Sequence, residues 1–177
     1  MGTPISEDEF ADLFRRFHSS AFRLETREYY AMSYEREAFH RFLKGHPQPP
    51  SALPWWQDWL NQMQELTHNG KRIGRVRIMS EPPTDYQRWE MWGTPFHVEV
   101  GEEIHYLSRS AALALHVPLD EDWWLFDDTR LVIMQYTSAG EIDGKTLITD
   151  PGVIARYCGW RDLAVSHATT AGSFAAV

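Results

Sequence analysis

Apolar and charged residues alternate along Ile73-Gly-Arg-Val-Arg-Ile-Met79. In an extended backbone Val76 and Ile78 fall on one face, and Arg75 and Arg77 fall together on the other. This period of two predicts a β-strand. The residues before position 71 follow the period of helices instead, so the chain changes character at this strand.

Three helices are expected before this strand. Ser6 and Glu9 have the spacing of a capping box, which predicts that the first helix begins there. Ser33 is expected to cap the second helix, which ends at Gly45. The third is expected over about 54–68. A short strand is expected within residues 21–30, and the three prolines of residues 46–50 predict a stiff linker.

The second half of the chain is expected to be richer in strands. A short helix from residue 84 or 85 is expected to end at Trp92, because Gly93 follows it. Asp150 followed by Pro151 predicts the start of a C-terminal helix that runs to about His167. Strands are expected between these helices, over residues 96–100, 104–107, 123–126, 130–137 and about 141–149.

These elements indicate an α+β fold. We expect a mostly antiparallel curved sheet, with N-terminal helices and a C-terminal helix packed on it. Residues 1–170 form a single domain in this prediction, with a helical lobe over 1–70 and a sheet lobe over 71–170 as an alternative. Residues 171–177 are expected to be a frayed tail.

Composition excludes several classes of protein. The chain has 177 residues with 17 Lys and Arg against 25 Asp and Glu, a formal net charge of −8. This charge disfavours direct binding to nucleic acid, and the sequence has no apolar run of the roughly 20 residues that span a bilayer. The first ten residues do not resemble a signal peptide. Cys158 is the single cysteine, which favours a reducing cytoplasm.

The segment from Arg75 to Glu90, Arg-Val-Arg-Ile-Met-Ser-Glu-Pro-Pro-Thr-Asp-Tyr-Gln-Arg-Trp-Glu, resembles an actinobacterial family of uncharacterised proteins. Further similar stretches include Phe22-Arg-Leu-Glu-Thr26 and Trp124-Leu-Phe-Asp-Asp128, and the likeness runs from about Phe10 to Tyr157. Members of this family are often encoded beside helix-turn-helix transcription regulators. The resemblance therefore implies a cytoplasmic bacterial protein whose neighbours are regulators.

Polar side chains gather around the double-proline bend at residues 82–83. Glu81, Tyr86, Arg88 and Glu90 are the candidate catalytic residues, because carboxylates, a phenol and a guanidinium can hold a polar ligand or transfer a proton to it. The alternative is a structural corner in which Glu90 pairs with an arginine and the neighbouring tryptophan packs in the core.

Arginine and tryptophan side chains supply the candidate ligand-binding residues. Arg75 and Arg77 share a strand face on which they can bind a carboxylate, a phosphate or an acidic partner. The alternative is a solvated sheet face balanced by glutamates at 99, 102 and 103. Trp89, Trp123 and Trp124 are candidates for a pocket wall or an interface, with core packing as their alternative.

Asp127 and Asp128 are also candidate ligand-binding residues. Paired carboxylates can hold a divalent metal, but a tight turn between two apolar runs also favours Asp-Asp, and we favour the turn. The histidines lack the spacing of a metal site, since His97, Glu99 and His105 converge only if their strands pair. Neither a metal nor a cofactor is expected.

Two functions are consistent with these observations. The first is a cytoplasmic accessory protein that binds a regulator partner or a small ligand through the arginine face and tryptophans. The alternative is a cofactorless lyase, isomerase or cyclase of natural-product biosynthesis, acting on a small apolar metabolite with acid/base residues in an aromatic pocket. Direct binding to nucleic acid or membrane is not expected, and a homo-oligomer is compatible with the sequence.

Overall fold

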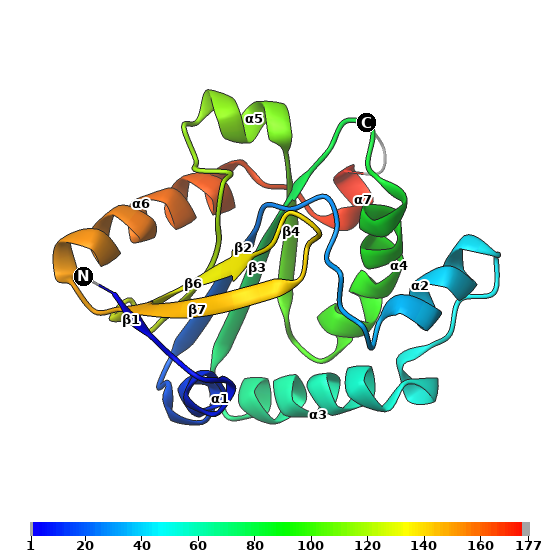
Figure 1. Ribbon diagram of the computed structural model, residues 1–177, viewed down its shortest axis with the longest axis horizontal. Helices are drawn as coiled ribbons and strands as arrows, with labels where there is room; N and C mark the ends of the chain where they lie inside the picture. The colour runs from blue at the N-terminus through cyan, green and yellow to red at the C-terminus, as the bar shows by residue number, and fades with distance from the viewer. Residues whose placement is uncertain (1, 175–177) are drawn as a thin grey trace.

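The computed structural model describes residues 2–174 and contains a seven-stranded sheet in the order β1-β7-β6-β5-β2-β3-β4 (Figure 1). β2, β3 and β4 run parallel to one another, and the other adjacent strands are antiparallel. The α+β class is therefore confirmed, with a mixed sheet. The strands are β1 (Thr3–Pro4), β2 (Ser20–Glu25), β3 (Arg72–Met79), β4 (Glu103–Ser108), β5 (Asp122–Phe126), β6 (Arg130–Tyr136) and β7 (Ile142–Ile148).

The helices lie on both sides of this sheet (Figure 1). Ser6 accepts a hydrogen bond from the Glu9 backbone N–H at 3.2 Å, and the Glu9 carboxylate accepts one from the Ser6 N–H, so the predicted capping box is confirmed. Asp150 caps the last long helix as predicted. The helices are α1 (Glu7–Arg16), α2 (Arg36–Leu43), the 3-10 helix η1 (Pro50–Ala52), α3 (Pro54–His68), α4 (Asp85–Glu99), α5 (Arg109–Ala114), α6 (Pro151–His167) and α7 (Ala171–Phe174).

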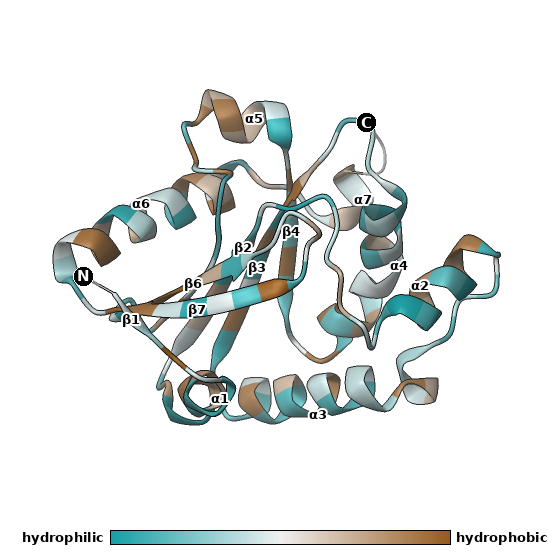
Figure 2. Ribbon diagram, in the orientation of Figure 1, coloured by the Kyte–Doolittle hydropathy of each residue, from teal (hydrophilic) through white to brown (hydrophobic). Residues whose placement is uncertain are grey.

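The two faces of the sheet differ in chemistry. One face is apolar and packs against α5 and α6, and its core includes Leu24, Val76 and Trp123. The other face lies toward α1, α3 and α4, and hydrophilic residues interrupt the apolar ones on the central strands (Figure 2). Because side chains alternate along a strand, Arg23 and Glu25 of β2 and Arg75 and Arg77 of β3 all fall on this second face. The candidate functional site therefore lies on this second face.

Helix α4 is longer than the sequence predicts. The expected stop at Gly93 and the strand over 96–100 are both wrong, because α4 continues through Gly93 and Pro95 to Glu99. A Cβ on Gly93 would lie 2.7 Å from Cζ2 of Trp56, so this glycine permits close contact with α3 and does not end the helix. Residues 96–100 alternate between apolar and polar side chains, as in a strand. Packing of α4 against the rest of the protein outweighs this local preference.

Three further expectations concern the ends of elements. The prediction that Ser33 caps the second helix is wrong, because α2 begins at Arg36 and its N-cap residue is Glu35. Residues 171–174 of the predicted frayed tail form α7, and residues 175–177 lie outside the described residues. β2 lies between β5 and β3, so residues 1–70 and 71–170 contribute strands to one sheet.

Candidate functional site

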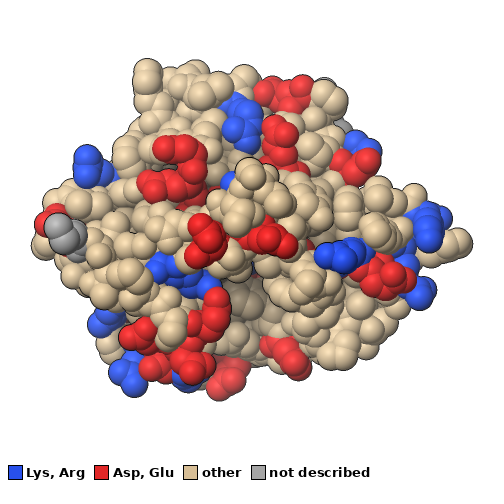
Figure 3. Space-filling model, viewed as in Figure 1, with Lys and Arg blue, Asp and Glu red and all other residues tan. Residues whose placement is uncertain are grey.

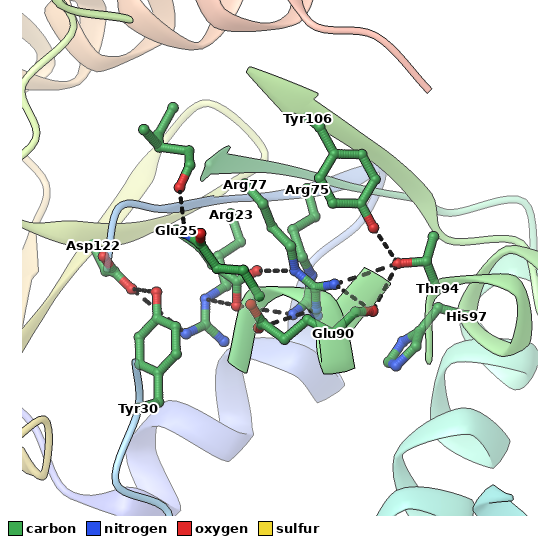
Figure 4. A network of polar contacts seen from close by, with 12 residues as sticks. Arg23, Glu25, Tyr30, Arg75, Arg77, Glu90, Thr94, His97, Tyr106 and Asp122 are labelled. Carbon is green, nitrogen blue, oxygen red and sulfur yellow. Dashed lines mark hydrogen bonds and ion pairs between the residues drawn. The ribbon is translucent and has the colours of Figure 1, made fainter. Parts of the chain in front are cut away.

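A buried carboxylate joins three arginines on the second face of the sheet (Figure 4). In the parallel pairing of β2 with β3, Arg23 lies opposite Arg75 and Glu25 lies opposite Arg77. Glu25 accepts hydrogen bonds from Arg75 Nη1 at 3.0 Å and from Arg77 Nε at 2.8 Å, and Arg23 Nε lies 3.2 Å from its Oε1 atom. Strand register therefore assembles this charged floor, which we call the arginine floor (Arg23, Glu25, Arg75 and Arg77).

A second carboxylate extends the arginine floor toward α3 and α4. Glu102 accepts hydrogen bonds from Arg75 Nη2 and from Trp59 Nε1, each at 3.2 Å, and also contacts His97 Nδ1. Trp56 Nε1 donates to His97 Nε2 at 2.9 Å. Since Nε2 accepts, the proton of a neutral His97 ring lies on Nδ1 and faces Glu102. Burial lowers the pKa of His97 and favours that neutral form.

Asp122 closes the other side of the floor. It accepts hydrogen bonds from the backbone N–H and the hydroxyl of Thr26, both at 2.8 Å, and from the Tyr30 hydroxyl at 2.5 Å. Its Oδ2 atom lies 3.8 Å from Arg23 Nη2. Burial nevertheless raises the pKa of Asp122, with Arg23 and the three hydrogen bonds acting in the opposite direction.

Aromatic rings enclose a cavity of about 360 Å³ above this floor. Trp55 stacks on Trp56 with a centroid separation of 5.7 Å, and Trp89 lies edge-on to Tyr86 at 5.4 Å. Figure 3 shows a hollow between β7 and α3, with acidic side chains near its rim. The aromatic lining consists of Phe10, Phe14, Tyr30, Tyr34, Trp55, Trp56, Trp59, Tyr86, Trp89, Trp124 and Tyr136.

Two further carboxyl groups, Glu35 and Glu90, line this cavity. Tyr86 donates a hydrogen bond from its hydroxyl to Glu35 Oε2 at 2.6 Å, and Glu90 Oε1 lies 3.5 Å from Arg77 Nη2. Burial raises the pKa of Glu35 to about 7, although the Tyr86 hydrogen bond opposes the shift. Burial also raises the pKa of Glu90, with Arg77 opposing it and nearby carboxylates adding to it. Both groups can therefore carry a proton near neutral pH.

Glu25 in the arginine floor and Glu102 beside it have lowered pKa values instead. Burial alone would raise the pKa of Glu25, but Arg23, Arg75 and Arg77 hold it well below its usual range. Burial likewise acts against ionisation of Glu102, yet Arg75 and hydrogen bonds hold its pKa at about 2. The cavity thus combines permanently ionised carboxylates below with proton-exchanging carboxyl groups at its wall.

The structure separates the four candidate catalytic residues. Tyr86 and Glu90 line the cavity, whereas Glu81 and Arg88 do not contribute to it. Glu81 accepts a hydrogen bond from the Ser110 N–H at 3.1 Å. Arg88 is exposed, contacts Asp85, and donates to the Pro83 carbonyl at 2.9 Å. Tyr86 and Glu90, four residues apart on one face of α4, therefore point into the cavity, and Arg88 on another face of the same helix does not.

The candidate ligand-binding residues also divide between the two faces. Arg75, Arg77, Trp89 and Trp124 line the cavity. The solvated-face interpretation of the arginines is wrong, because Arg75 and Arg77 are only 7% and 6% exposed. Trp123, one residue before Trp124, lies on the opposite face and packs against Tyr157 of α6.

Asp127 and Asp128 form the turn between β5 and β6, with φ angles of 51° and 53°. Asp127 accepts hydrogen bonds from the backbone N–H groups of His18 and Ser19, both at 2.7 Å, and Asp128 pairs with Arg161. The carboxylates therefore have structural partners, as the turn interpretation requires. Within residues 2–174, no group of three or more His, Cys, Asp or Glu side chains is arranged to hold a metal ion.

The sequence did not indicate most of the residues that line the cavity. Arg23 and Glu25 alternate with Phe22 and Leu24 as Arg75 and Arg77 do with their apolar neighbours, and this shared pattern was the available signal. Glu35 stands in an irregular segment, where no periodicity marks it. Other residues that the sequence did not single out include Trp56, Trp59 and Asp122, whereas Glu102 was expected to balance the arginines and does pair with Arg75.

These observations define an α+β protein with an aromatic cavity on a charged sheet face. The chain belongs to the family described as a domain of unknown function (DUF6879), which matches residues 8–176. A comparison with curated proteins gave no significant match. Among solved structures, NucT from Helicobacter pylori is similar in fold, with a TM-score of 0.54 and 8% sequence identity over 96% of this chain and 98% of that chain. In residues 2–174, no helix has the length and apolar character needed to cross a membrane.

Proposed function

We propose that the protein binds a small, partly aromatic molecule in the cavity between the arginine floor and α1, α3 and α4. The observation that carries this proposal is the cavity of about 360 Å³ itself, because its rings surround a few convergent polar groups. Sites for small molecules typically have volumes of about 300–1,000 Å³ and this combination of apolar walls and few polar anchors.

Binding is tested with three small probes of similar shape: 2-phenylethanol, 2-phenylethylamine and 3-phenylpropionate. A probe at 100 times its dissociation constant stabilises the folded state by about 2.7 kcal/mol. At about 2–4 °C per kcal/mol for a chain of this size, that raises the melting temperature by roughly 5–10 °C. No shift with any probe at millimolar concentration would remove the proposal.

Two tryptophan variants locate the binding site. Trp55→Ala removes a ring that lines the cavity and is expected to weaken probe binding at least tenfold, measured by calorimetry. Trp160→Ala removes a ring on α6, across the sheet, and is the matched control. Equal effects of the two substitutions would place the bound probe elsewhere.

A second function is supported by Glu35, whose carboxyl group is hydrogen-bonded to Tyr86 and has a pKa of about 7 inside an aromatic cavity. Such a group is suited to general acid/base catalysis without a cofactor. A carboxylate at Glu35 would take a proton from the carbon next to a carbonyl group and leave an enolate. In D₂O the resulting carboxylic acid would exchange its proton with solvent and return a deuteron to the same carbon. We propose phenylacetone as the probe, with deuterium exchange in D₂O followed by NMR. Exchange that is unchanged in Glu35→Gln would exclude this role.

The predicted association with a helix-turn-helix regulator remains a proposal. An acidic protein of net charge −8 is suited to pair with the basic surface of a DNA-binding protein. A pull-down with a neighbouring regulator at low and high salt tests it, and failure to form a complex at low salt would contradict it.

A further inference from the structure

The charged groups around the cavity are unequal in number. Three guanidinium groups, at Arg23, Arg75 and Arg77, face five carboxyl groups, at Glu25, Glu35, Glu90, Glu102 and Asp122. A further cation on the lining, Lys145, pairs with Glu7. If every carboxyl group of this cluster were ionised, it would carry an excess of two negative charges in a largely buried place. Burial of uncompensated charge is costly, so the excess has to be met by protons or by a cation.

The geometry shows which carboxyl groups are open to a ligand. Glu25 and Glu102 are occupied by arginines, and Asp122 accepts three hydrogen bonds. Glu35 and Glu90 line the cavity instead. Glu35 is held at one oxygen by the Tyr86 hydroxyl, and Glu90 lies 3.5 Å from Arg77. Of these five carboxyl groups, Glu35 and Glu90 therefore have the fewest partners and are the ones left for a ligand.

The walls beside Glu35 and Glu90 favour positive charge as well. Tyr34, Trp55, Tyr86 and Trp89 present aromatic rings to the cavity, and the face of an aromatic ring attracts a cation. The protein already uses this contact internally, since the Arg23 guanidinium lies 5.5 Å from the centroid of the Trp124 ring.

From this charge balance and these rings, we infer that the natural ligand is a small organic amine with an apolar body, whose ammonium group binds between Glu35 and Glu90. A primary ammonium supplies three hydrogen-bond donors, which oxygen atoms of the two carboxyl groups can accept. The apolar body lies among the tryptophans. This inference rests on the proposed binding function and specifies its ligand.

The proton balance of binding follows from the same arrangement. The groups facing the two carboxyls are Tyr86, Tyr34 and Arg77, with Arg23, Glu25 and Arg75 in the floor below. An ammonium ion carries one positive charge, so it replaces one of the two carboxyl protons and releases it to solvent, while the other carboxyl group keeps its proton. Calorimetry of 2-phenylethylamine at pH 7, in two buffers of different ionisation enthalpy, measures this release on the unmodified full chain.

The decisive comparison is among the three probes. We expect 2-phenylethylamine to bind at least tenfold more tightly than 2-phenylethanol and 3-phenylpropionate, with proton release for the amine alone. Glu35→Gln should weaken amine binding about tenfold and alter alcohol binding less than twofold. Glu37→Gln, on the exposed side of α2 and paired with Arg41, is the matched control and should change neither.

The outcomes separate the two proposals. If the alcohol binds as tightly as the amine, or the carboxylate binds best, the amine inference is overturned while cavity binding stands. Amine binding without proton release, and with full affinity in Glu35→Gln, also overturns it. If none of the probes binds, the proposed binding function fails and the inference fails with it.

Discussion

Replacement of Glu25 by Gln should strongly destabilise the fold. The substitution keeps the shape of the side chain but removes the negative charge shared by Arg23, Arg75 and Arg77. All four side chains are less than a fifth exposed, so water cannot replace the lost carboxylate. Breaking a buried ion pair by removing one partner costs about 3–5 kcal/mol. That is a large part of the roughly 5–15 kcal/mol by which a native domain is stable.

Urea unfolding followed by circular dichroism measures the change in the free energy of unfolding. The same loss should lower the melting temperature by roughly 6–20 °C, at about 2–4 °C per kcal/mol. The difference in the free energy of unfolding between the wild type and Glu25→Gln should have its full size above the ordinary carboxyl pKa of 4.5. It should become smaller as the pH falls toward the lowered pKa of folded Glu25.

Glu103→Gln is the control for that experiment. Glu103 pairs with Arg72 at 3.0 Å, but both side chains are well exposed, and surface pairs contribute about 0–1 kcal/mol. A Glu25→Gln variant that lies within 1 kcal/mol of the wild type, like this control, would refute the view that Glu25 holds the arginine floor together.

Three further predictions concern the cavity and the turn. The free energy of unfolding should fall by up to about 3 kcal/mol between pH 4.5 and pH 8 as Glu35 loses its proton in the folded state, and Glu35→Gln should remove that part of the pH dependence in urea titrations. Gly93→Ala should cost about 1–3 kcal/mol by displacing Trp56, despite the better helix propensity of alanine, and a stabilised variant in calorimetry would contradict this. Asp127→Ala should cost about 1–3 kcal/mol and Asp127→Asn less, because Asn tolerates a positive φ; equal melting temperatures for both would argue against the turn interpretation.

The local signals in the sequence were sufficient for most elements. The helix from Pro151 to His167 follows from Asp150 and Pro151, because a cap and a proline at the first turn depend only on neighbouring residues. The strand over 73–79 was also predictable, since its period is unbroken. The parallel pairing of β2 with β3 was not, because it joins residues about 50 positions apart.

The candidate site was harder to predict for the same reason. Tyr86 and Glu90 share one helix face, so their neighbourhood could be read from spacing. Glu35 reaches the cavity only through the tertiary fold, and Glu25 meets Arg77 only through strand pairing. The helix through Gly93 and Pro95 was concealed because both residues usually end helices, and the close contact of Gly93 with Trp56 is visible only in space.

The arginine floor also bears on how the strands find their partners during folding. If β2 slipped by one position against β3, each of its charged side chains would turn into the apolar layer beneath α5 and α6. A slip of two would keep the correct face but set Glu25 opposite Met79, away from Arg77, its partner in the native register. Buried arginines that lose their shared carboxylate are costly, so the slipped pairing is disfavoured. The ion pairs thus disfavour incorrect registers of β2 against β3 more than they stabilise the native sheet.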